Sequence, residues 1–318
     1  MVLNNYKIAI IGAGSVGSTL AYTLMLGRIV TEIVIIDQNE QKAQGEAMDL
    51  NHGLSFVDST NIYAGDYRAT KDAKIIVITA GAAQKTGETR IDLLNRNIII
   101  LKKIIDNIVQ YNKSAVLLVV TNPVDILSYA TFRFSSFPSH RVIGSGTVLD
   151  TSRLKFLISK YCQINPKNVH AYVIGEHGDS EFPLWSHALI GGSPIQDFCK
   201  ECSGCDNCIK KTNLDRFLEE TKSAAYKIIE KKGTSCYATA LAIRSIVHSI
   251  LRNECSILCT SNLINGYYGV NNVYLGTPAV INRIGVRNLI TLRLSTKEKK
   301  YFIRSADKLK QLIKRVNL

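Results

Sequence analysis

The 318-residue sequence lacks any apolar run close to the roughly 20 residues that a membrane-spanning helix requires. It therefore offers no membrane segment, and we expect no membrane partner. There is also no room for a signal peptide, because an apolar strand begins at Lys7 and Gly12 interrupts it. From these absences we expect a cytoplasmic protein. Internal repeats are missing as well, and the one compositionally biased segment is a cysteine-rich stretch within residues 195–211.

Acidic residues are scarce relative to basic ones, 26 against 39, which gives a formal net charge of +13. An excess of this size raises the question of nucleic-acid binding. The basic residues are scattered along the chain, however, and many belong to predicted helices whose opposite face is apolar. Solvated helix surfaces account for them, and we expect no nucleic-acid partner.

The chain has enough apolar residues, 46%, to fill the cores of two layered domains. Residues 7–11 form a short apolar strand, and Gly12, Gly14 and Gly17 follow it directly. A helix is expected from Ser18 to Leu26. In this strand–turn–helix context the three glycines predict a dinucleotide-binding turn, since they allow a tight turn, close approach of a pyrophosphate and close packing of helix on strand.

An acidic residue ends the next apolar strand. Residues 33–36 are apolar, and Asp37 follows them, twenty residues after Gly17. A carboxylate at this place accepts hydrogen bonds from a ribose 2′-hydroxyl and repels a 2′-phosphate. The pattern therefore predicts NAD as the cofactor in preference to NADP.

The alternation of strands and helices continues to about residue 145. Apolar runs at 74–79, 115–120 and 140–144 read as further buried strands, and a helix is expected over 92–111. Continuous apolar strands of this kind are typical of parallel sheets covered on both faces. We predict an α/β protein in which residues 1–145 form a Rossmann-type, doubly wound parallel sheet.

Residues 146–318 change character and predict an α+β substrate domain packed on the first. Helices are expected over 148–161, 214–230, 234–251 and 296–316. Strands are expected over 169–174, 256–264, 267–270, 273–281 and 285–292, several of them joined by Asn/Gly turns.

Residues 174–180 place His177 between two glycines and next to carboxylates. Together with Asp150, Arg153 and Arg90, they supply a proton donor, a carboxylate to orient it and two arginines, the groups needed to reduce a 2-keto acid with a nicotinamide. Each residue alone has an ordinary structural explanation: a lone histidine is usually structural, and Asp150 and Arg153 have the spacing of a surface ion pair. Their combination favours the catalytic interpretation.

Several motifs occur together and in order. They are Gly12–Gly17, Gly81–Arg90, Thr121–Asp125, Leu149–Arg153, Gly175–Asp179 and Gly276–Asn282. With them the chain resembles, almost end to end, the bacterial L-lactate dehydrogenases of the lactate/malate dehydrogenase superfamily.

The resemblance implies a role for each group around pyruvate. His177 would protonate the ketone oxygen, Asp150 would orient His177 and raise its pKa, and Arg153 would bind the carboxylate with two parallel hydrogen bonds. Arg90 would stabilise the developing alkoxide, carried into the site by a closing segment, and Asn122 would orient substrate or histidine. No metal is expected at this site.

The resemblance also implies a set of cofactor contacts and a means of regulation. The NAD-binding residues would be Gly12, Gly14, Ser15, Val16, Gly17, Asp37, Lys42, Tyr67, Gly81, Ala82, Val120, Thr121 and Asn122. A homotetramer is expected, with activation by fructose 1,6-bisphosphate at a subunit interface through Lys155 and His170. Lysine lacks the bidentate phosphate geometry of the arginine usual in the family, which would weaken this activation.

Gln84 decides between keto acids in this interpretation. A malate dehydrogenase of the superfamily carries an arginine here to pair the second carboxylate of oxaloacetate, whereas Gln84 is neutral, so pyruvate is favoured. Ser235 stands where a threonine usually contacts the substrate methyl, and Thr239 replaces an apolar residue. Both departures leave room for a broader L-2-hydroxyacid dehydrogenase, and an alignment shifted by one residue would make Thr234 the contact.

Four cysteines carry the rival hypothesis of a metal-binding or redox-sensing module. Cys199, Cys202, Cys205 and Cys208 form a C-x2-C-x2-C-x2-C run, which resembles a zinc or iron–sulfur ligand set. The segment falls where the family often has a variable surface insertion, and the longer final gap and the proline of a ferredoxin-like site are missing. The other cysteines, Cys162, Cys236, Cys255 and Cys259, read as small buried residues.

Overall fold

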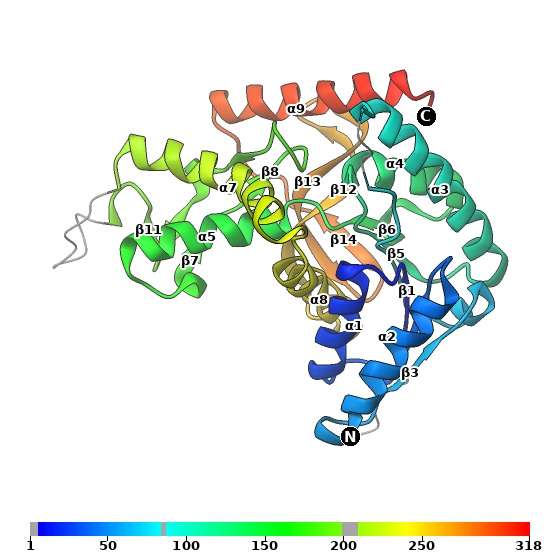
Figure 1. Ribbon diagram of the computed structural model, residues 1–318. Helices are drawn as coiled ribbons and strands as arrows, with labels where there is room; N and C mark the ends of the chain where they lie inside the picture. Colours follow the sequence, from blue (N-terminus) through cyan, green and yellow to red (C-terminus); the bar gives the residue numbers. More distant parts are fainter. Residues whose placement is uncertain (1–5, 84–86, 199–208) are drawn as a thin grey trace.

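The computed structural model describes residues 6–83, 87–198 and 209–318 (Figure 1). Its largest element is a nine-stranded sheet with the order β14-β13-β12-β6-β5-β4-β1-β2-β3. The six strands from β3 to β6 are parallel, in the order 3-2-1-4-5-6 of a dinucleotide-binding fold. They are β1 (Lys7–Ile11), β2 (Glu32–Ile36), β3 (Asn61–Ala64), β4 (Ile75–Ile78), β5 (Val116–Val119) and β6 (Val142–Gly144). The predicted doubly wound sheet is confirmed.

Helices cover both faces of this sheet because successive side chains of each strand point to opposite sides. In β1, Ile8 and Ile10 pack into one core cluster, whereas Ala9 and Ile11 pack into the other. The helices of this half are α1 (Ser15–Leu26), α2 (Glu40–His52), α3 (Arg90–Tyr111) and α4 (Val124–Ser135). The first begins three residues earlier than predicted, so that its N-terminus meets the glycine turn directly. The sequence patterns had not identified α2, β3 or α4.

The second half extends the same sheet, which the sequence did not predict. The strands β12 (Ser256–Tyr267), β13 (Val270–Asn282) and β14 (Gly285–Leu289) form an antiparallel meander that meets β6 where Ser261 pairs with Gly144. The prediction of separate strands over 256–264 and 267–270 was wrong. Gly266, at a φ of +86°, sits in an irregularity within β12 rather than in a turn that ends it.

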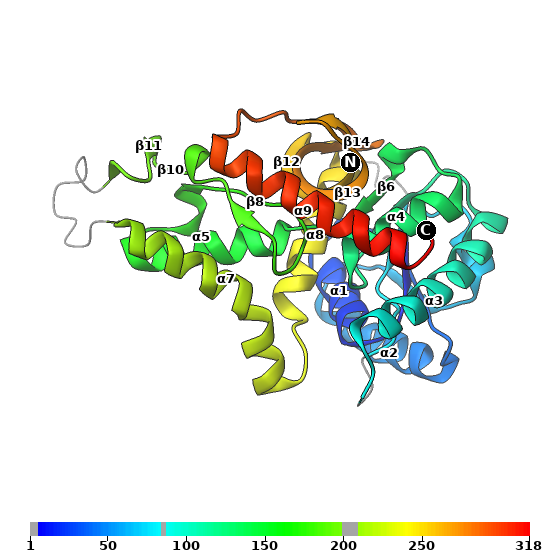
Figure 2. The ribbon, with the colours of Figure 1, turned by 90° about the horizontal axis from the view of Figure 1, so that it is seen from above.

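A lobe projects from the sheet on the side of α5 and α7 (Figures 1 and 2). Its helices are α5 (Val148–Cys162) and α7 (Lys211–Lys232). Helix α8 (Tyr237–Arg252) packs on α1 and β13, and α9 (Thr296–Arg315) packs on β13 and α4. Its short strands are β7 (Val169–His170), β8 (Val173–Ile174), β9 (Phe182–Pro183), β10 (Leu189–Ile190) and β11 (Ser193–Pro194). The predicted strand 169–174 is divided in two because its halves join different sheets, β7 pairing with β10 and β8 with β9.

Among the described residues, short 3-10 helices also occur at Gly53–Phe56, Tyr67–Thr70, Ser139–Arg141, Pro166–Asn168 and Trp185–His187. Within the described ranges, no helix combines the length and the apolar character needed to cross a membrane.

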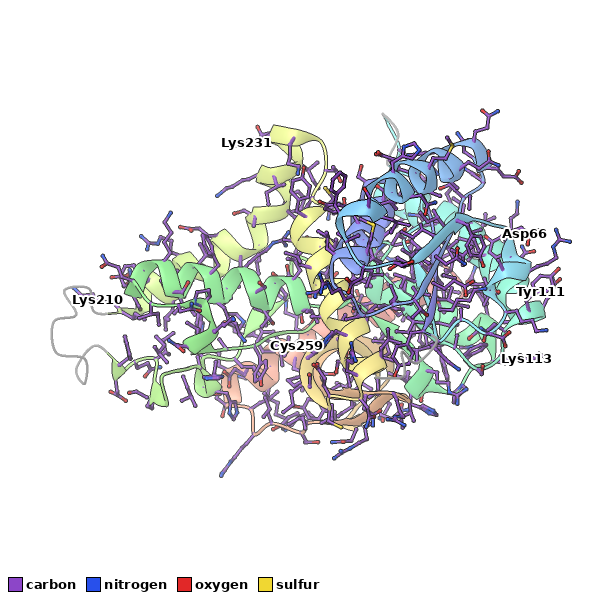
Figure 3. All side chains as sticks on the ribbon, turned by 90° about the horizontal axis from the view of Figure 1, so that it is seen from below. Asp66, Tyr111, Lys113, Lys210, Lys231 and Cys259 are labelled. Carbon is purple, nitrogen blue, oxygen red and sulfur yellow. The ribbon has the colours of Figure 1, made fainter. Side chains whose placement is uncertain are left out.

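Figure 3 places Cys259 on β12 in the interior, and Lys210 and Lys231 near the two ends of α7. Cys236 and Cys259 are buried as predicted, whereas Cys162 and Cys255 are half-buried, so for these two the prediction was wrong. Cys199, Cys202, Cys205 and Cys208 lie outside the described residues.

Candidate active site

The glycine turn after β1 has the shape that a bound pyrophosphate requires. A Cβ on Gly17 would lie 1.9 Å from the carbonyl oxygen of Gly12, and one on Gly12, at a φ of +114°, would lie 2.7 Å from Thr79 Oγ1. A Cβ on Gly14 would meet nothing within 4 Å. Gly12 and Gly17 therefore serve close packing, while Gly14 faces open space. No side chain caps α1, so the backbone N–H groups at its start, including those of Ser15 and Val16, are available to an anion.

Asp37 closes the nucleotide end of this site. Its carboxylate accepts hydrogen bonds from the backbone N–H groups of Ala13, at 2.7 Å, and Asn39, at 2.9 Å. Tyr67 lies nearby: burial raises the pKa of its phenol, and the charge of Asp37 raises it further. Lys42 is exposed in the first turn of α2. A fixed carboxylate here fits a ribose with free hydroxyls and opposes a 2′-phosphate, so the residues present fit NAD.

The remaining cofactor candidates lie at the carboxyl ends of β4 and β5. Thr121 Oγ1 donates to the carbonyl oxygen of Ala80 at 2.8 Å, and its methyl would clash with any Cβ on Gly81. Buried Asn97 accepts from the N–H of Ala82 at 2.8 Å and donates to the carbonyl oxygen of Asn122 at 3.3 Å. Residues 80–82, after β4, and residues 121–122, after β5, are thus joined by hydrogen bonds at the edge of the sheet where ligands of such folds bind.

His177, Asp150 and Arg153 form one hydrogen-bonded group. Asp150, on α5 and 2% exposed, binds Nδ1 of His177 through Oδ2 at 2.7 Å and Nη1 of Arg153 through Oδ1 at 2.8 Å. The sequence spacing of Asp150 and Arg153 had allowed a surface ion pair, but burial of the carboxylate excludes a solvated one. The structure therefore brings the proposed acid, its orienting carboxylate and the carboxylate anchor together.

The electrostatics of this group favour a protonated histidine. Burial by itself would lower the pKa of His177, but the charge and hydrogen bond of Asp150 outweigh it and raise the pKa to about 9. Burial would raise the pKa of Asp150, but His177 and Arg153 hold it below its ordinary value. At neutral pH the pair is an imidazolium and a carboxylate, with Nε2 of the ring left to donate a proton.

A cavity of about 210 Å³ lies in front of His177. Its lining includes His177 and Arg153 with Val16, Val120, Asn122, Ser145, Gly146, Leu149, Ala225, Ile229, Thr234, Ser235, Thr239, Ala242 and Ile243. Thr234 and Ser235 both line it, so either can contact substrate. Thr239 also faces it, but its hydroxyl donates to the carbonyl oxygen of Ser235 at 2.8 Å, which makes this wall less polar than its composition indicates.

Arg90 stands away from this group. It begins α3, its side chain is 77% exposed, and its Nη1 lies 3.5 Å from the carboxylate of Asp179. The described lining of the cavity does not include it. Gln84 lies outside the described residues. Arg96 links Ala83 and Glu88, which lie on either side of Gln84 in the sequence. Its Nη2 donates to the carbonyl oxygen of Ala83 at 2.8 Å and to the carboxylate of Glu88 at 2.7 Å.

Three consecutive residues of the loop that carries His177 are fixed to different elements. Gly175 exchanges two backbone hydrogen bonds of 2.9 Å with Gly276 of β13. The N–H of Glu176 donates to Ser305 Oγ of α9 at 2.7 Å, and the N–H of His177 donates to Asp125 Oδ2 of α4 at 2.7 Å. The backbone of the loop is therefore held by β13, α9 and α4, while the imidazole, bound to Asp150 through Nδ1, lines the cavity.

Asp125 contacts the candidate site, although sequence reasoning did not single it out. It is buried, binds Ser261 Oγ as well as the N–H of His177, and burial raises its pKa to about 6 although both hydrogen bonds oppose the shift. The motif Thr121–Asp125 contains it, but its partner lies 52 residues away, so no local pattern showed its role. Buried Glu181, with a carboxylate oxygen within 4.8 Å of a ring nitrogen of His177 and an oxygen of Asp150, was not singled out either.

The two predicted effector residues have different surroundings. Lys155 is half-buried on α5, where burial lowers the pKa of its ammonium and the neighbouring Cys259 opposes the shift. His170 is exposed on β7. Neither Lys155 nor His170 is among the described residues that line the cavity in front of His177.

Comparison with known proteins identifies the family. Residues 6–144 match the lactate/malate dehydrogenase NAD binding domain, and residues 147–317 match the lactate/malate dehydrogenase alpha/beta C-terminal domain. The chain is 49% identical over 312 residues to an L-lactate dehydrogenase of Acetivibrio thermocellus, covering 98% of each chain. It is 50% identical over 305 residues to one of Clostridium perfringens, covering 96% of this chain and 95% of the relative.

Solved structures agree with these relatives. A lactate dehydrogenase from a Medee basin deep-sea metagenome library superposes with a TM-score of 0.95 at 43% identity, covering 99% of both chains. A minor L-lactate dehydrogenase of Enterococcus mundtii, in a ligand-bound form, superposes with a TM-score of 0.94 at 36% identity, covering 98% of both. The chain belongs to the lactate/malate dehydrogenase family and is an NAD-dependent oxidoreductase with a Rossmann-type cofactor domain.

Proposed function

We propose that the protein is an L-lactate dehydrogenase that reduces pyruvate to (S)-lactate with NADH, reversibly, and regenerates NAD in fermentation. The observation that carries the proposal is the group formed by His177, Asp150 and Arg153 at the edge of the cavity. The two relatives at about half identity over nearly the whole chain bear the same name, which supports it.

The proposed chemistry follows from the positions of these side chains. NADH, held by the glycine turn and Asp37, would supply the hydride for reduction of the ketone carbon. Arg153 binds the substrate carboxylate with its planar guanidinium, and Nε2 of His177 donates a proton to the ketone oxygen. Asp150 holds Nδ1–H of the ring, fixes its tautomer and stabilises the imidazolium before the transfer. In the direction of lactate oxidation the neutral ring accepts the proton back.

Other residues have supporting roles in the proposal. Arg90 stabilises charge on the ketone oxygen, which requires its side chain to leave Asp179 and enter the site. Asn122 orients substrate, and Ser235 contacts the substrate methyl group, as the cavity lining allows. Gln84 provides no cation for a second carboxylate, which favours pyruvate over oxaloacetate.

The pH dependence of the reaction should follow His177. Pyruvate reduction needs the imidazolium, so its kcat/KM should be level at neutral pH and fall about tenfold per pH unit above the pKa of about 9. Lactate oxidation needs the neutral ring, so its kcat/KM should rise with pH through the same region. Initial rates in both directions between pH 6 and 10 test this. A reduction profile that already falls near pH 6.5 would contradict the assigned ion pair.

We also propose a division of the chain into two domains, an oligomeric state and a cellular location. Residues 1–145 bind NAD, and residues 146–318 bind substrate and supply His177. The proposed homotetramer would cover exposed apolar side chains such as Met48, Phe56, Tyr237 and Leu241, which are 60%, 87%, 69% and 54% exposed. A cytoplasmic location would suit an enzyme that recycles NADH from fermentation.

Fructose 1,6-bisphosphate is the proposed effector, bound where Lys155 and His170 meet a neighbouring subunit. An effector acts only through its preference for one of two states, so activation should lower the half-saturating pyruvate concentration. Pyruvate saturation curves with and without the sugar bisphosphate, near neutral pH and at low enzyme concentration, test this. Superimposable curves would refute the effector site and leave the catalytic proposal unchanged.

The proposed substrate is tested by NADH oxidation with pyruvate, oxaloacetate and 2-ketoisocaproate in parallel. Pyruvate should give the highest kcat/KM. Faster turnover of oxaloacetate would refute the interpretation of Gln84. Comparable turnover of 2-ketoisocaproate would favour the broader L-2-hydroxyacid dehydrogenase that Ser235 and Thr239 allow.

A further inference from the structure

Asp125 anchors the backbone of His177 from a different element. It lies in the first turn of α4, is 3% exposed, and its Oδ2 accepts a hydrogen bond from the N–H of His177 at 2.7 Å. Its other oxygen, Oδ1, accepts from the hydroxyl of Ser261, a fully buried residue of β12. One buried carboxylate therefore joins α4, β12 and the loop that carries the proposed proton donor.

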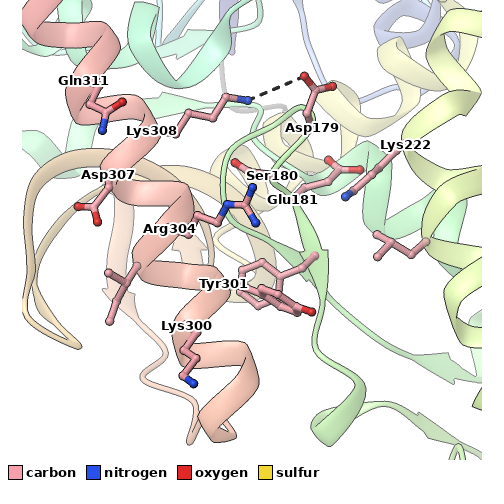
Figure 4. A pocket seen from close by; sticks show the side chains of 13 residues that line it. Asp179, Ser180, Glu181, Lys222, Lys300, Tyr301, Arg304, Asp307, Lys308 and Gln311 are labelled. Carbon is pink, nitrogen blue, oxygen red and sulfur yellow. Dashed lines mark ion pairs between the residues drawn. The ribbon is translucent and has the colours of Figure 1, made fainter.

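Asp125 is absent from the described lining of both cavities near this loop. The substrate cavity is lined by His177 and Asn122 but not by Asp125. A second cavity, about 870 Å³, lies between α7 and α9, and its described lining does not include Asp125 either. Figure 4 shows this second cavity, where Lys308 of α9 extends toward Asp179 of the loop, 3.9 Å away. An effect of Asp125 on the reaction therefore passes through His177.

Burial and the surrounding groups act on the charge of Asp125 in opposite directions. Burial raises its pKa to about 6, although the hydrogen bonds from Ser261 and from the N–H of His177, and the positive charge of the His177 ring, oppose the rise. The Glu176 carboxylate adds to the rise, and it is itself paired with Lys308 of α9 at 2.8 Å. At pH 7 the carboxyl of Asp125 is therefore mainly ionised, and it becomes neutral as the pH falls below about 6.

An uncharged side chain would be sufficient for packing at this position. An asparagine can accept from the N–H of His177 and donate to the hydroxyl of Ser261, without the cost of burying a charge. A charged acceptor, however, binds an N–H roughly twice as strongly as a neutral one. The charge of Asp125 is also among the groups that raise the pKa of His177. The carboxylate thus holds His177 more firmly than the amide would.

We propose that Asp125 is a positioning residue for the proposed reaction: while ionised it holds the backbone of His177 so that the ring meets the substrate, and on protonation this hold weakens. Ser261 supports the ionised form, because a hydrogen bond to a charged acceptor favours the charge. This inference rests on the proposed function, since the position of His177 affects turnover only if that residue exchanges a proton with substrate.

The test follows kcat/KM for pyruvate reduction between pH 5 and 10. In the wild type it should fall as the pH drops through about 6, because Asp125 takes up a proton. Ser261→Ala removes a hydroxyl that opposes this protonation, so the acid limb should move to higher pH by about one unit. The alkaline limb, which follows His177, should stay in place.

Ser249→Ala is the matched control for loss of a buried hydroxyl. Ser249 lies on α8, is fully buried, and donates to the carbonyl oxygen of Ile281 at 2.8 Å. Its replacement should move neither limb. An acid limb that belonged to another buried carboxyl near His177, such as Glu181, would not respond to the loss of the Ser261 hydroxyl.

Asp125→Asn removes the titrating group and keeps its shape. The acid limb should disappear, and kcat at pH 7 should be about tenfold lower, in line with the difference between a charged and a neutral acceptor. KM for pyruvate should change little, because Arg153 still binds the carboxylate. Amide hydrogen exchange of residues 175–180, compared at one pH, should be faster in the variant than in the wild type, which tests the hold on His177 without turnover.

An acid limb that stays in place in folded, active Ser261→Ala, or that persists in Asp125→Asn, would overturn the inference. A wild-type profile that is level down to pH 5 would overturn it as well. If Asp125→Asn does not fold, Ser261→Ala still decides. A wild type unable to reduce pyruvate would instead overturn the proposed function, and the hydrogen-exchange comparison would still test the contact between Asp125 and His177.

Discussion

His177→Asn should reduce kcat for pyruvate reduction by about 10⁴-fold, the upper range for loss of a general acid. The amide occupies similar space and keeps a donor near Asp150, but it has no proton to transfer to the ketone oxygen. The pyrophosphate turn at Gly12–Gly17 lies on a different element, so NADH binding should be unchanged. Single-turnover rates with pyruvate and a fluorescence titration with NADH measure the two effects separately.

The matched control is His52→Asn, because His52 is exposed at the end of α2 and lies outside the described lining of the substrate cavity. It should retain wild-type rates. If His177→Asn kept substantial turnover, or lost NADH binding with the same severity as activity, the assignment of His177 as the proton donor would be wrong.

Arg153→Lys should lower kcat/KM for pyruvate by about 10²-fold or more, mainly through a higher KM. Complete loss of one partner from a buried, hydrogen-bonded charge pair costs about 2–5 kcal/mol, and lysine, which keeps the charge but loses the two parallel hydrogen bonds, should lie toward the lower end of that range. Lysine keeps a positive charge next to Asp150, so the ion pair with His177 should persist and the falling limb of the pH profile should stay in place. What lysine cannot provide is the planar, bidentate contact with a carboxylate.

Initial-rate measurements against pyruvate concentration separate the two parameters. Arg216→Lys is the control, since Arg216 is an exposed residue of α7 paired with Glu220 at 3.6 Å. An Arg153→Lys variant with unchanged KM would show that the substrate carboxylate binds elsewhere.

The parallel half of the fold could be predicted from the sequence because its signals are local. An apolar run followed at once by Gly12, Gly14 and Gly17 specifies strand, turn and helix without reference to any distant residue. Helix α2 and strand β3 were missed: α2 has few apolar residues, buries only Ala43 and Ala47, and is therefore too polar to show a clear period. Its neighbours are β2 and β3, and these contacts leave no local pattern in the sequence.

The antiparallel extension could not be predicted because it depends on long-range pairing. Nothing near Ser261 indicates that β12 meets Gly144 of β6, and the Asn265-Gly266 pair has the composition of a hairpin turn. In the structure this pair is absorbed as an irregularity because both flanking segments continue to pair with β13.

The candidate site also contains residues that local motifs identify and residues that only long-range contacts reveal. His177, Asp150 and Arg153 were identified from motifs, and the structure brings them together. Asp125 and Glu181 were not identified, because their importance comes from burial and from partners on other elements. The sequence does not show whether an acidic residue lies in a solvated loop or in a buried cluster, and only the fold distinguishes the two cases.

The most direct measurement is chiral analysis of the product formed from pyruvate and NADH, with NADH consumption followed in the same sample. The central claim is that Arg153 and His177 hold pyruvate in one orientation for hydride transfer. It predicts one (S)-lactate for each NADH oxidised and no (R)-lactate. Racemic or (R)-lactate, or NADH consumed without lactate, would contradict it.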